Sequence, residues 1–260
     1  YVDKTGFIEK MNAVLNTRQK FICVSRPRRF GKSMTADMLS AYYGRSEDSA
    51  DLFDDLIISR TETYRKYLNQ YDVVKINMQD FLSAANEMDE MLRLLQKRVL
   101  ADLKYAYPEY VDGDNLSFAM QDIFAYTCRP FVILIDEWDC LFREYQEDKD
   151  SQKKYLDFLR AWLKDKDYVA LAYMTGILPI KKYGSHSALN MFTEYSMTDS
   201  GDLAEYFGFT EIEVRELCAR YEMSFEETKA WYDGYRLVTH TKDGDLCRYM
   251  YNPKSVVEAM

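Results

Sequence analysis

The sequence predicts an α/β fold in which a parallel β-sheet is flanked by helices. Short apolar runs typical of buried strands alternate with amphipathic stretches of helical period between residues 21 and 176. A Gly-Lys-Ser tripeptide stands where one such run passes into a helix, and the strongly apolar run FVILI is followed by two carboxylates. Strands and helices in alternation imply parallel strands joined by right-handed crossovers.

The first three elements follow from local patterns. Residues 21–25 (FICVS) are predicted to form a buried strand, which ends where Pro27 keeps the preceding residue extended. A helix is expected from Ser33 onward, because apolar residues recur there at helical spacing, and Gly44 is a natural helix stop. Residues 72–78 (DVVKINM) are predicted to be the second strand.

The second half of the alternation has the clearest signals. Residues 87–106 are predicted to form a strongly amphipathic helix, and another is expected at 116–126. Residues 131–136 are apolar up to the final Asp, as in a strand buried on both faces of a parallel sheet. A helix with a Ser cap is expected at 151–164, and a fourth strand at 168–176.

After about residue 200 the strand signals stop. The segments FTEIEVRELCARY and SFEETKAWYDGYR are predicted to be two capped helices. We therefore expect an α/β core at residues 1–200 and a small helical lid at residues 201–260. The chain starts without Met and stops inside a helix-like segment, so we expect a fragment with a truncated lid.

Composition limits the classes of function. A formal charge of −9 and a pI near 4.9 disfavour a surface that coats nucleic acid, because phosphate neutralisation needs clustered Lys and Arg. The five cysteines form no CxxC pair, which favours reduced thiols and a cytoplasmic location. No apolar run approaches the ~18 residues of a membrane span, so no membrane partner is expected.

Residues 25–34, SRPRRFGKSM, end like a phosphate-binding loop. In such a loop backbone N–H groups turn toward a phosphate, and the following helix adds its positive N-terminal end. Gly31 would permit the close approach, Lys32 would reach the outer phosphates, and Ser33 would hold Mg²⁺. The pattern G-x-x-x-x-G-K-[ST] fails at its first position, Arg26. A solvated basic turn is the alternative, but the position between a strand and a helix favours the phosphate loop.

Two carboxylates and a threonine supply the rest of a nucleotide site. Asp136 ends a buried strand and is suited to the Mg²⁺ shell, while Glu137 stands where a water could be polarised. Thr175 ends the next buried strand, where it could sense the terminal phosphate or orient the water. The alternatives are a solvated strand end or helix cap for the acids and an ordinary strand-terminal Thr. Together with the loop, the acids favour the nucleotide site.

Several segments together resemble a known family. In order and spacing they are similar to the bacterial AAA-ATPase-like family, whose members often carry a PD-(D/E)xK nuclease-like domain after the ATPase region. The segments that carry the resemblance are YVDKTGFIEKM, VSRPRRFGKSMTADML, VILIDEWD, MTGILPI, YFGFTEIEV, WYDGYR and YNPKSVVEAM. The resemblance spans essentially the whole chain, and RPRRFGKS and WYDGYR…YNP are its most specific parts.

The resemblance implies a P-loop NTPase of the AAA-like type, with a parallel sheet in the order 5-1-4-3-2, flanking helices and a C-terminal helical lid. It implies that Lys32 and Ser33 carry the Walker A roles and Asp136 and Glu137 the Walker B roles. The family's loop itself resembles R-P-R-R-F-G-K-S, so Arg26 is a family trait. No D…(D/E)xK arrangement follows the lid, so cleavage activity is not assigned to these residues.

The expected ligands are ATP and Mg²⁺, with Ser33 and Asp136 as the metal-binding residues. The candidate catalytic residues are Glu137, Lys32 and Thr175. The candidate nucleotide-binding residues are those of the loop and one arginine of the lid: Arg28, Arg29, Phe30, Gly31, Lys32, Ser33, Met34 and Arg236. Arg28 and Arg29 could equally contact a partner, and Arg236 could be a surface arginine packed against Tyr235.

Two classes of function remain open at this point. One is a Mg-dependent ATP-hydrolysing domain that powers or regulates a partner, such as a nuclease-like domain, with nucleic acid reached through that partner. The other is a nucleotide-gated switch or scaffold with little or no hydrolysis. Glu137 beside Asp136 favours the first. A small-molecule kinase is a weaker third interpretation, and a homo-oligomer is a candidate assembly.

Overall fold

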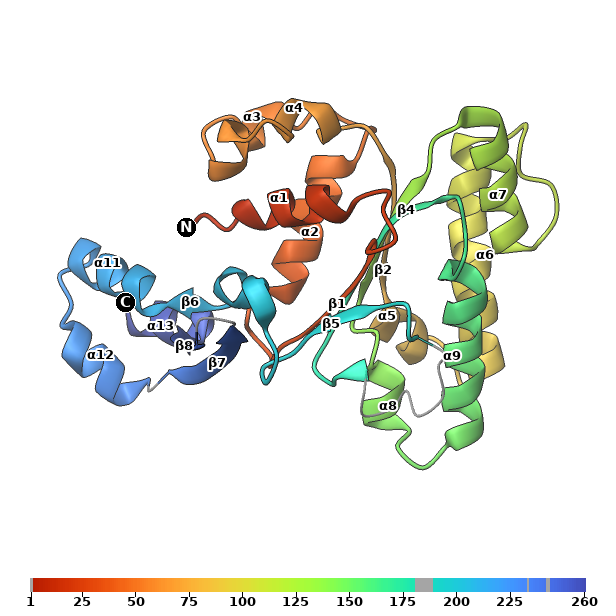
Figure 1. Cartoon of the computed structure of the whole chain (residues 1–260). Coiled ribbons are helices and arrows are strands. Elements are labelled where there is room, and N and C mark those ends of the chain that lie inside the picture. Colours follow the sequence, from red (N-terminus) through yellow and green to blue (C-terminus); the bar gives the residue numbers. More distant parts are fainter. Residues whose placement is uncertain (1, 181–188, 233, 242–243) are drawn as a thin grey trace.

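A computed structural model describes residues 2–180, 189–232, 234–241 and 244–260. Figure 1 shows a larger unit built around a parallel sheet and a smaller unit, from the end of the chain, lying to one side of it. The larger sheet has five strands in the order β2-β3-β4-β1-β5, and the smaller has three in the order β6-β8-β7. The described strands are β1 (Phe21–Ser25), β2 (Asp72–Asn77), β3 (Phe131–Asp136), β4 (Val169–Gly176), β5 (Thr193–Tyr195), β6 (Phe209–Thr210), β7 (Tyr235–Thr241) and β8 (Gly244–Tyr251).

Helices cover the large sheet and make up much of the smaller unit. The helices of the larger unit are α1 (Gly6–Val14), α2 (Lys32–Tyr43), α3 (Ala50–Phe53), the 3-10 helix η1 (Ile57–Arg60), α4 (Tyr64–Tyr67), α5 (Met78–Ser83), α6 (Met88–Ala106), α7 (Leu116–Thr127), α8 (Cys140–Glu144) and α9 (Lys149–Leu163). The 3-10 helix η2 (Gly201–Tyr206) leads to α11 (Glu211–Arg220), α12 (Phe225–Trp231) and α13 (Pro253–Ala259). In the described part of the chain, no helix has the length and apolarity needed to cross a membrane.

The strand order confirms the predicted order 5-1-4-3-2. β1 pairs with β4 and β5, and β3 pairs with β2 and β4, all in parallel. Every residue of β1, β3 and β4 is buried, which explains their continuous apolar runs. Because the strands are parallel, the carboxyl ends of β1, β3 and β4 lie at one edge of the sheet. The phosphate loop follows β1 at that edge.

The two faces of the sheet are covered by different helices. Ile22, Val24 and Leu134 belong to a hydrophobic cluster with residues of α1 and α2. Cys23 and Ile135 belong to a second cluster with α6, α7 and α9, which stand on the other side of the sheet in Figure 1. Side chains alternate between faces along a strand, so the residue two positions after Leu134 faces α2. That residue is Asp136.

Two parts of the larger unit gave too weak a signal for the sequence to predict. β5 has only three residues, with sequence Thr-Glu-Tyr, and forms because the outer edge of β1 is available for pairing. The short helices α3, η1 and α4 form a segment between α2 and β2. Each has four residues, fewer than a periodic pattern needs to be detected.

The smaller unit contains the expected helices and also a sheet that was not expected. α11 begins at a capping box formed by Thr210 and Glu213, and the side chain of Ser224 caps α12. α12 ends at Trp231, so the prediction that its helical segment continues to Arg236 was wrong. Tyr235 and Arg236 instead begin β7, which pairs antiparallel with β8. β7 and β8 (YRLVTHT and GDLCRYMY) mix polar with apolar residues, so their sequences lack the long apolar run that predicts a buried strand.

The two units meet at the phosphate loop. Phe30 of the loop is buried with Ala204, Leu237 and Met250 in one hydrophobic cluster. Phe207, after η2, packs instead into the core of the larger unit. The boundary at residues 200 and 201 stays a prediction.

Replacing Leu134 by Ala should destabilise the protein by about 2–5 kcal/mol, because the side chain is fully buried in the central strand and its removal leaves a cavity. Urea denaturation followed by circular dichroism would measure the change in the free energy of unfolding. Leu52→Ala on α3 is the control, since Leu52 is 64% exposed and its truncation should cost less than about 0.5 kcal/mol. Equal losses of stability in both variants would contradict the burial of Leu134 in β3.

Candidate nucleotide site

The backbone between β1 and α2 has the shape of an anion-binding loop. Gly31, immediately before α2, has φ of 83° and ψ of 10°, in the left-handed region that glycine adopts at low cost. A Cβ built at this position would meet nothing within 4 Å. The backbone conformation, rather than the surrounding protein atoms, therefore explains the need for glycine. No side chain caps α2, so the N–H groups of its first turn have no side-chain acceptor and can bind an anion.

Lys32 is folded back onto its own loop. The side chain is buried, and Nζ donates a hydrogen bond to the carbonyl oxygen of Pro27 at 3.0 Å. Burial lowers the pKa of the ammonium, while the negative charges of Glu137 and Asp136 oppose the shift. The lysine thus lies close to the acidic pair, and a bound phosphate would replace the carbonyl of Pro27 as its acceptor.

Ser33 and Asp136 are in direct contact. Ser33 Oγ donates a hydrogen bond to Asp136 Oδ2 at 2.5 Å, although the two residues come from α2 and β3. Asp136 is buried, and its Oδ1 accepts a hydrogen bond from the backbone N–H of Glu137 at 2.9 Å. The structure therefore brings together the two residues that the sequence predicted to share a magnesium ion.

Glu137 and Thr175 lie beside this contact. Glu137 has φ of 53°, and its Oε2 accepts a hydrogen bond from Nη2 of Arg143. Thr175 lies on β4 next to β3, where Ile135 pairs with Met174. Its hydroxyl is buried and makes no hydrogen bond with any described group. A polar atom of this kind beside Asp136 fits a site that binds a polar ligand.

Magnesium suits the donors present. A serine hydroxyl and a carboxylate are hard oxygen ligands, which Mg²⁺ prefers, and its remaining positions are commonly filled by water and phosphate oxygens. Among the described residues, no group of three or more His, Cys, Asp and Glu side chains could hold a metal without such help. The residues therefore fit a Mg²⁺ ion that arrives with a nucleotide.

Arg26, which replaces the first glycine of the usual pattern, is fully buried. Its Nη1 donates hydrogen bonds to the carbonyl oxygens of Ser25 and Tyr195, at 3.0 and 2.9 Å. The guanidinium lies 5.5 Å from the ring centroid of Phe207. Burial lowers its pKa to about 10. Arg26 thus joins the loop to β5 and to the start of the smaller unit, a role that the sequence did not reveal.

The other residues that the sequence predicted to bind nucleotide lie in different surroundings. Phe30 points into the smaller unit, where its ring meets that of Tyr235 edge to face at 5.3 Å. Arg28 and Arg29 are exposed, and Met34 is 68% exposed on the first turn of α2. Arg236 is exposed on β7 and donates a hydrogen bond to the sulfur of Cys247. Nucleotide contact by these residues stays a prediction.

Two residues of the site were missed in the sequence, Asp139 and Gly176. Asp139 is fully buried, and its Oδ2 accepts hydrogen bonds from the backbone N–H groups of Ile177 and Leu178 at 3.0 and 2.7 Å. A Cβ on Gly176 would lie 2.6 Å from Asp139 Oδ1 and 2.8 Å from the indole of Trp138. In the sequence, the third acid of DEWD and the glycine of MTG are the signals that could have identified these two residues.

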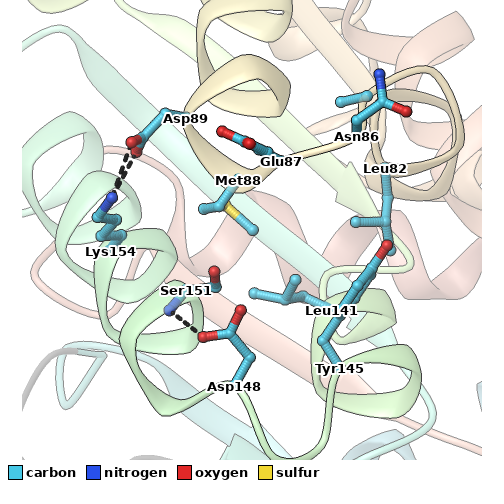
Figure 2. Close-up of a pocket in the computed structure, with 11 residues that line it drawn as sticks. Leu82, Asn86, Glu87, Met88, Asp89, Leu141, Tyr145, Asp148, Ser151 and Lys154 are labelled. Carbon is cyan, nitrogen blue, oxygen red and sulfur yellow. Dashed lines mark hydrogen bonds and ion pairs between the residues drawn. The ribbon is translucent and has the colours of Figure 1, made fainter.

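Two hollows lie away from the phosphate loop. The one in Figure 2, of about 240 Å³, lies among α5, α6, α8 and α9, with Leu141 and Met88 on its walls and an ion pair between Asp89 and Lys154 at its rim. A second, of about 670 Å³, lies between the N-terminal segment and the smaller unit. None of the candidate nucleotide-binding or catalytic residues lines either hollow.

Residues 1–185 match the model of a protein family described as AAA-ATPase-like, predicted AAA-ATPase. The chain belongs to the AAA-ATPase-like family. The match covers both halves of the site, the loop at residues 26–33 and the acids that follow β3. It confirms the family resemblance of the sequence, and the sheet order and loop agree with the P-loop NTPase fold that the resemblance implied.

Two individual proteins are similar to this member of the family. An uncharacterised protein in the vnfD 5′ region of Azotobacter chroococcum mcd 1 is 25% identical over 246 residues. The match covers 90% of this chain but only 45% of the relative, so the chain spans less than half of the relative's length. The ORC2 protein of Aeropyrum pernix, solved in ADPNP-ADP complexes, has 11% identity and a TM-score of 0.44, covering 88% of this chain and 56% of that one.

Replacing Gly176 by Ala should destabilise this family member by roughly 1–3 kcal/mol, because the added methyl group would overlap the buried Asp139 and Trp138. Urea denaturation would measure the change. Gly6→Ala is the control: its nearest contact would be 3.3 Å from a Tyr206 ring atom, so we expect a smaller effect. A Gly176→Ala protein as stable as the wild type would contradict the close packing of β4 against the segment after β3.

Proposed function

We propose that this chain binds Mg·ATP at the loop of residues 26–33 and hydrolyses it. The observation that carries the proposal is the contact between Ser33 Oγ and Asp136 Oδ2, because it joins the loop to the strand that carries the acids. Membership of a family described as predicted AAA-ATPases supports the same conclusion. The reaction converts ATP and water to ADP, inorganic phosphate and a proton.

Each residue of the site has a role in this proposal. The N–H groups at the start of α2 and the ammonium of Lys32 bind the phosphates. Ser33 and Asp136 hold Mg²⁺, which when bound neutralises charge on the phosphate oxygens. Glu137 accepts a hydrogen bond from the attacking water and orients it in line with the terminal phosphate. Thr175, beside Asp136, contacts the terminal phosphate or the same water.

The remaining loop residues have secondary roles. Arg28, Arg29 and Met34 are exposed on and next to the loop, where they can contact phosphate or base. Arg236, exposed on β7, is proposed as a further nucleotide contact. Phe30 is buried in the smaller unit, so its part in nucleotide binding is to shape the loop.

A nucleotide-gated switch is the second candidate function. It is favoured by the packing of Phe30 among Ala204, Leu237 and Met250, because a change in the loop on nucleotide binding would be felt directly in the smaller unit. In this version the output is the position of residues 201–260, and hydrolysis is slow or absent.

The partner and the location are also proposals. We propose that the nucleotide cycle regulates a partner, for which a nuclease-like domain is the candidate, and that nucleic acid is reached only through it. The negative net charge supports this, because it disfavours direct coating of nucleic acid. A homo-oligomer could supply an arginine in trans. The five free cysteines, two of them exposed, support a reducing cytoplasmic location.

Removal of Lys32 should weaken nucleotide binding, and removal of the Glu137 charge should slow hydrolysis. We expect Lys32→Ala to lower ATP affinity roughly 10–100-fold, the equivalent of one charge-assisted hydrogen bond. Glu137→Gln should keep the affinity and lower kcat by about 10²-fold or more. Phosphate release with Mg·ATP and titration with a fluorescent ATP analogue would measure both.

Two variants provide matched controls outside the site. Lys154→Ala removes a lysine paired with Asp89 on the surface, and Glu144→Gln alters an acid that accepts a hydrogen bond from Gln79. Both should behave as wild type. Tight binding of ATP without phosphate release would favour the nucleotide-gated switch over ATP hydrolysis. Undiminished turnover in Glu137→Gln would remove that residue from the mechanism.

A further inference from the structure

Arg143 is ion-paired to the proposed catalytic glutamate. It lies near the end of α8, six residues after Glu137, and its side chain is 17% exposed. Its Nη2 donates a hydrogen bond to Oε2 of Glu137. No hydrogen bond to Oε1 of Glu137 is found in the described part of the chain, so this oxygen remains available.

The guanidinium also faces a second acid, as an ion pair in which its Nε makes no hydrogen bond with any described group. Its Nε lies 3.5 Å from Oδ2 of Asp139, which is fully buried. The same oxygen accepts hydrogen bonds from the N–H groups of Ile177 and Leu178, in the segment after β4. Because Asp139 is fixed by two backbone groups, Arg143 connects Glu137 to a rigid part of the structure.

Arg143 also contributes to the charge balance of the site. Among the described residues, the charges that act on Lys32 are those of three carboxylates, Asp136, Glu137 and Asp139, and of one further cation, Arg143. Burial lowers the pKa of Lys32, and the positive charge of Arg143 lowers it further. Without Arg143, the uncompensated negative charge of this group would rise from one to two, and Glu137 would lose its paired cation.

The other loop and lid arginines do not have this geometry. Arg26 is buried against the carbonyl of Tyr195 and the ring of Phe207. Arg28 and Arg29 are exposed, and Arg236 contacts Cys247. Among the ion pairs of the described residues, that of Arg143 is the one that includes a candidate catalytic residue.

We propose that Arg143 is a positioning residue for Glu137: it holds Oε2 so that Oε1 is directed to the attacking water. The inference rests on the proposed function. Glu137 follows the last residue of β3 in a left-handed conformation, and its side chain is 24% exposed. Without the guanidinium this carboxylate is free to rotate toward solvent, and the water loses its fixed acceptor.

The test is a double-mutant cycle on kcat between Arg143 and Glu137. We expect Arg143→Ala to lower kcat about 10–100-fold, as for residues coupled through one network, and Arg143→Lys to restore part of the loss. In the Glu137→Gln background, Arg143→Ala should change kcat less than about threefold, because the carboxylate it positions is gone. Affinity for ADP should stay within about threefold throughout. Phosphate release and fluorescent ADP titration provide these values.

Arg45→Ala is the matched control. Arg45 is also a partly exposed arginine paired with a carboxylate, that of Asp72 at 3.5 Å, at the first residue of β2 and so at the opposite edge of the sheet. It should leave kcat unchanged. Thermal unfolding of each variant establishes that the proteins are folded, and the partial rescue by Lys separates positioning from a purely structural role.

Three outcomes would overturn the inference in an active protein. A rise in kcat in Arg143→Ala would mean that the pair restrains Glu137. An equal fall in the wild-type and Glu137→Gln backgrounds would mean that Arg143 acts independently of Glu137. Unchanged kcat would mean that it has no role. A wild-type chain that binds ATP without releasing phosphate contradicts the hydrolysis itself and this role with it, and one that binds no nucleotide contradicts the proposed function as a whole.

Discussion

The site depends on one contact, between the hydroxyl of Ser33 and the carboxylate of Asp136. β1 and β3 are not neighbours, because β4 lies between them, but both run parallel to β4 and therefore end at the same edge of the sheet. α2 then has to start at the tip of β1 and pack over β3 for its first turn to reach Asp136. The contact at 2.5 Å therefore depends on the sheet order, on the strand direction and on the packing of α2. A change in any of these would separate the two halves of the site.

The same loop is held from its other side by the smaller unit. The N–H of Gly208 donates to the carbonyl of Phe30 at 3.2 Å, and the amide of Asn252 donates to the carbonyl of Arg28 at 3.4 Å. The ring of Phe30 is buried in the same unit. A loop held at both ends by different units cannot change shape without moving one against the other. If a nucleotide binds at this loop as proposed, these contacts would couple its binding to the position of residues 201–260.

The sequence predicted the central strands because they have strong local signals. The sheet order followed from the family resemblance, and the roles of the site residues stay predictions. β1, β3 and β4 are buried along their whole length, so their apolar runs stand out, and the phosphate loop has a fixed pattern around Gly31. The sheet of the smaller unit was missed because its strands mix polar with apolar residues. The sequence also could not predict which side chains form hydrogen bonds or ion pairs with one another. The pairing of Arg143 with Glu137 depends on how a five-residue helix turns after β3, and no spacing rule specifies that turn.

Arg26 shows how the loop can differ from the common pattern and keep its shape. A glycine at this position would contribute only backbone freedom, whereas the arginine adds one hydrogen bond to Tyr195 of β5, one to Ser25 of β1 and a ring contact to Phe207. The cost is a buried charge, since its Nε and Nη2 have no hydrogen-bond partner among the described groups. The hydroxyl of Thr175 and Oδ1 of Asp139, also near the loop, are buried without a partner in the same sense. Unsatisfied polar groups are costly, and several in one place mark a region where stability is given up for function. A ligand that satisfies some of them would recover part of that free energy on binding.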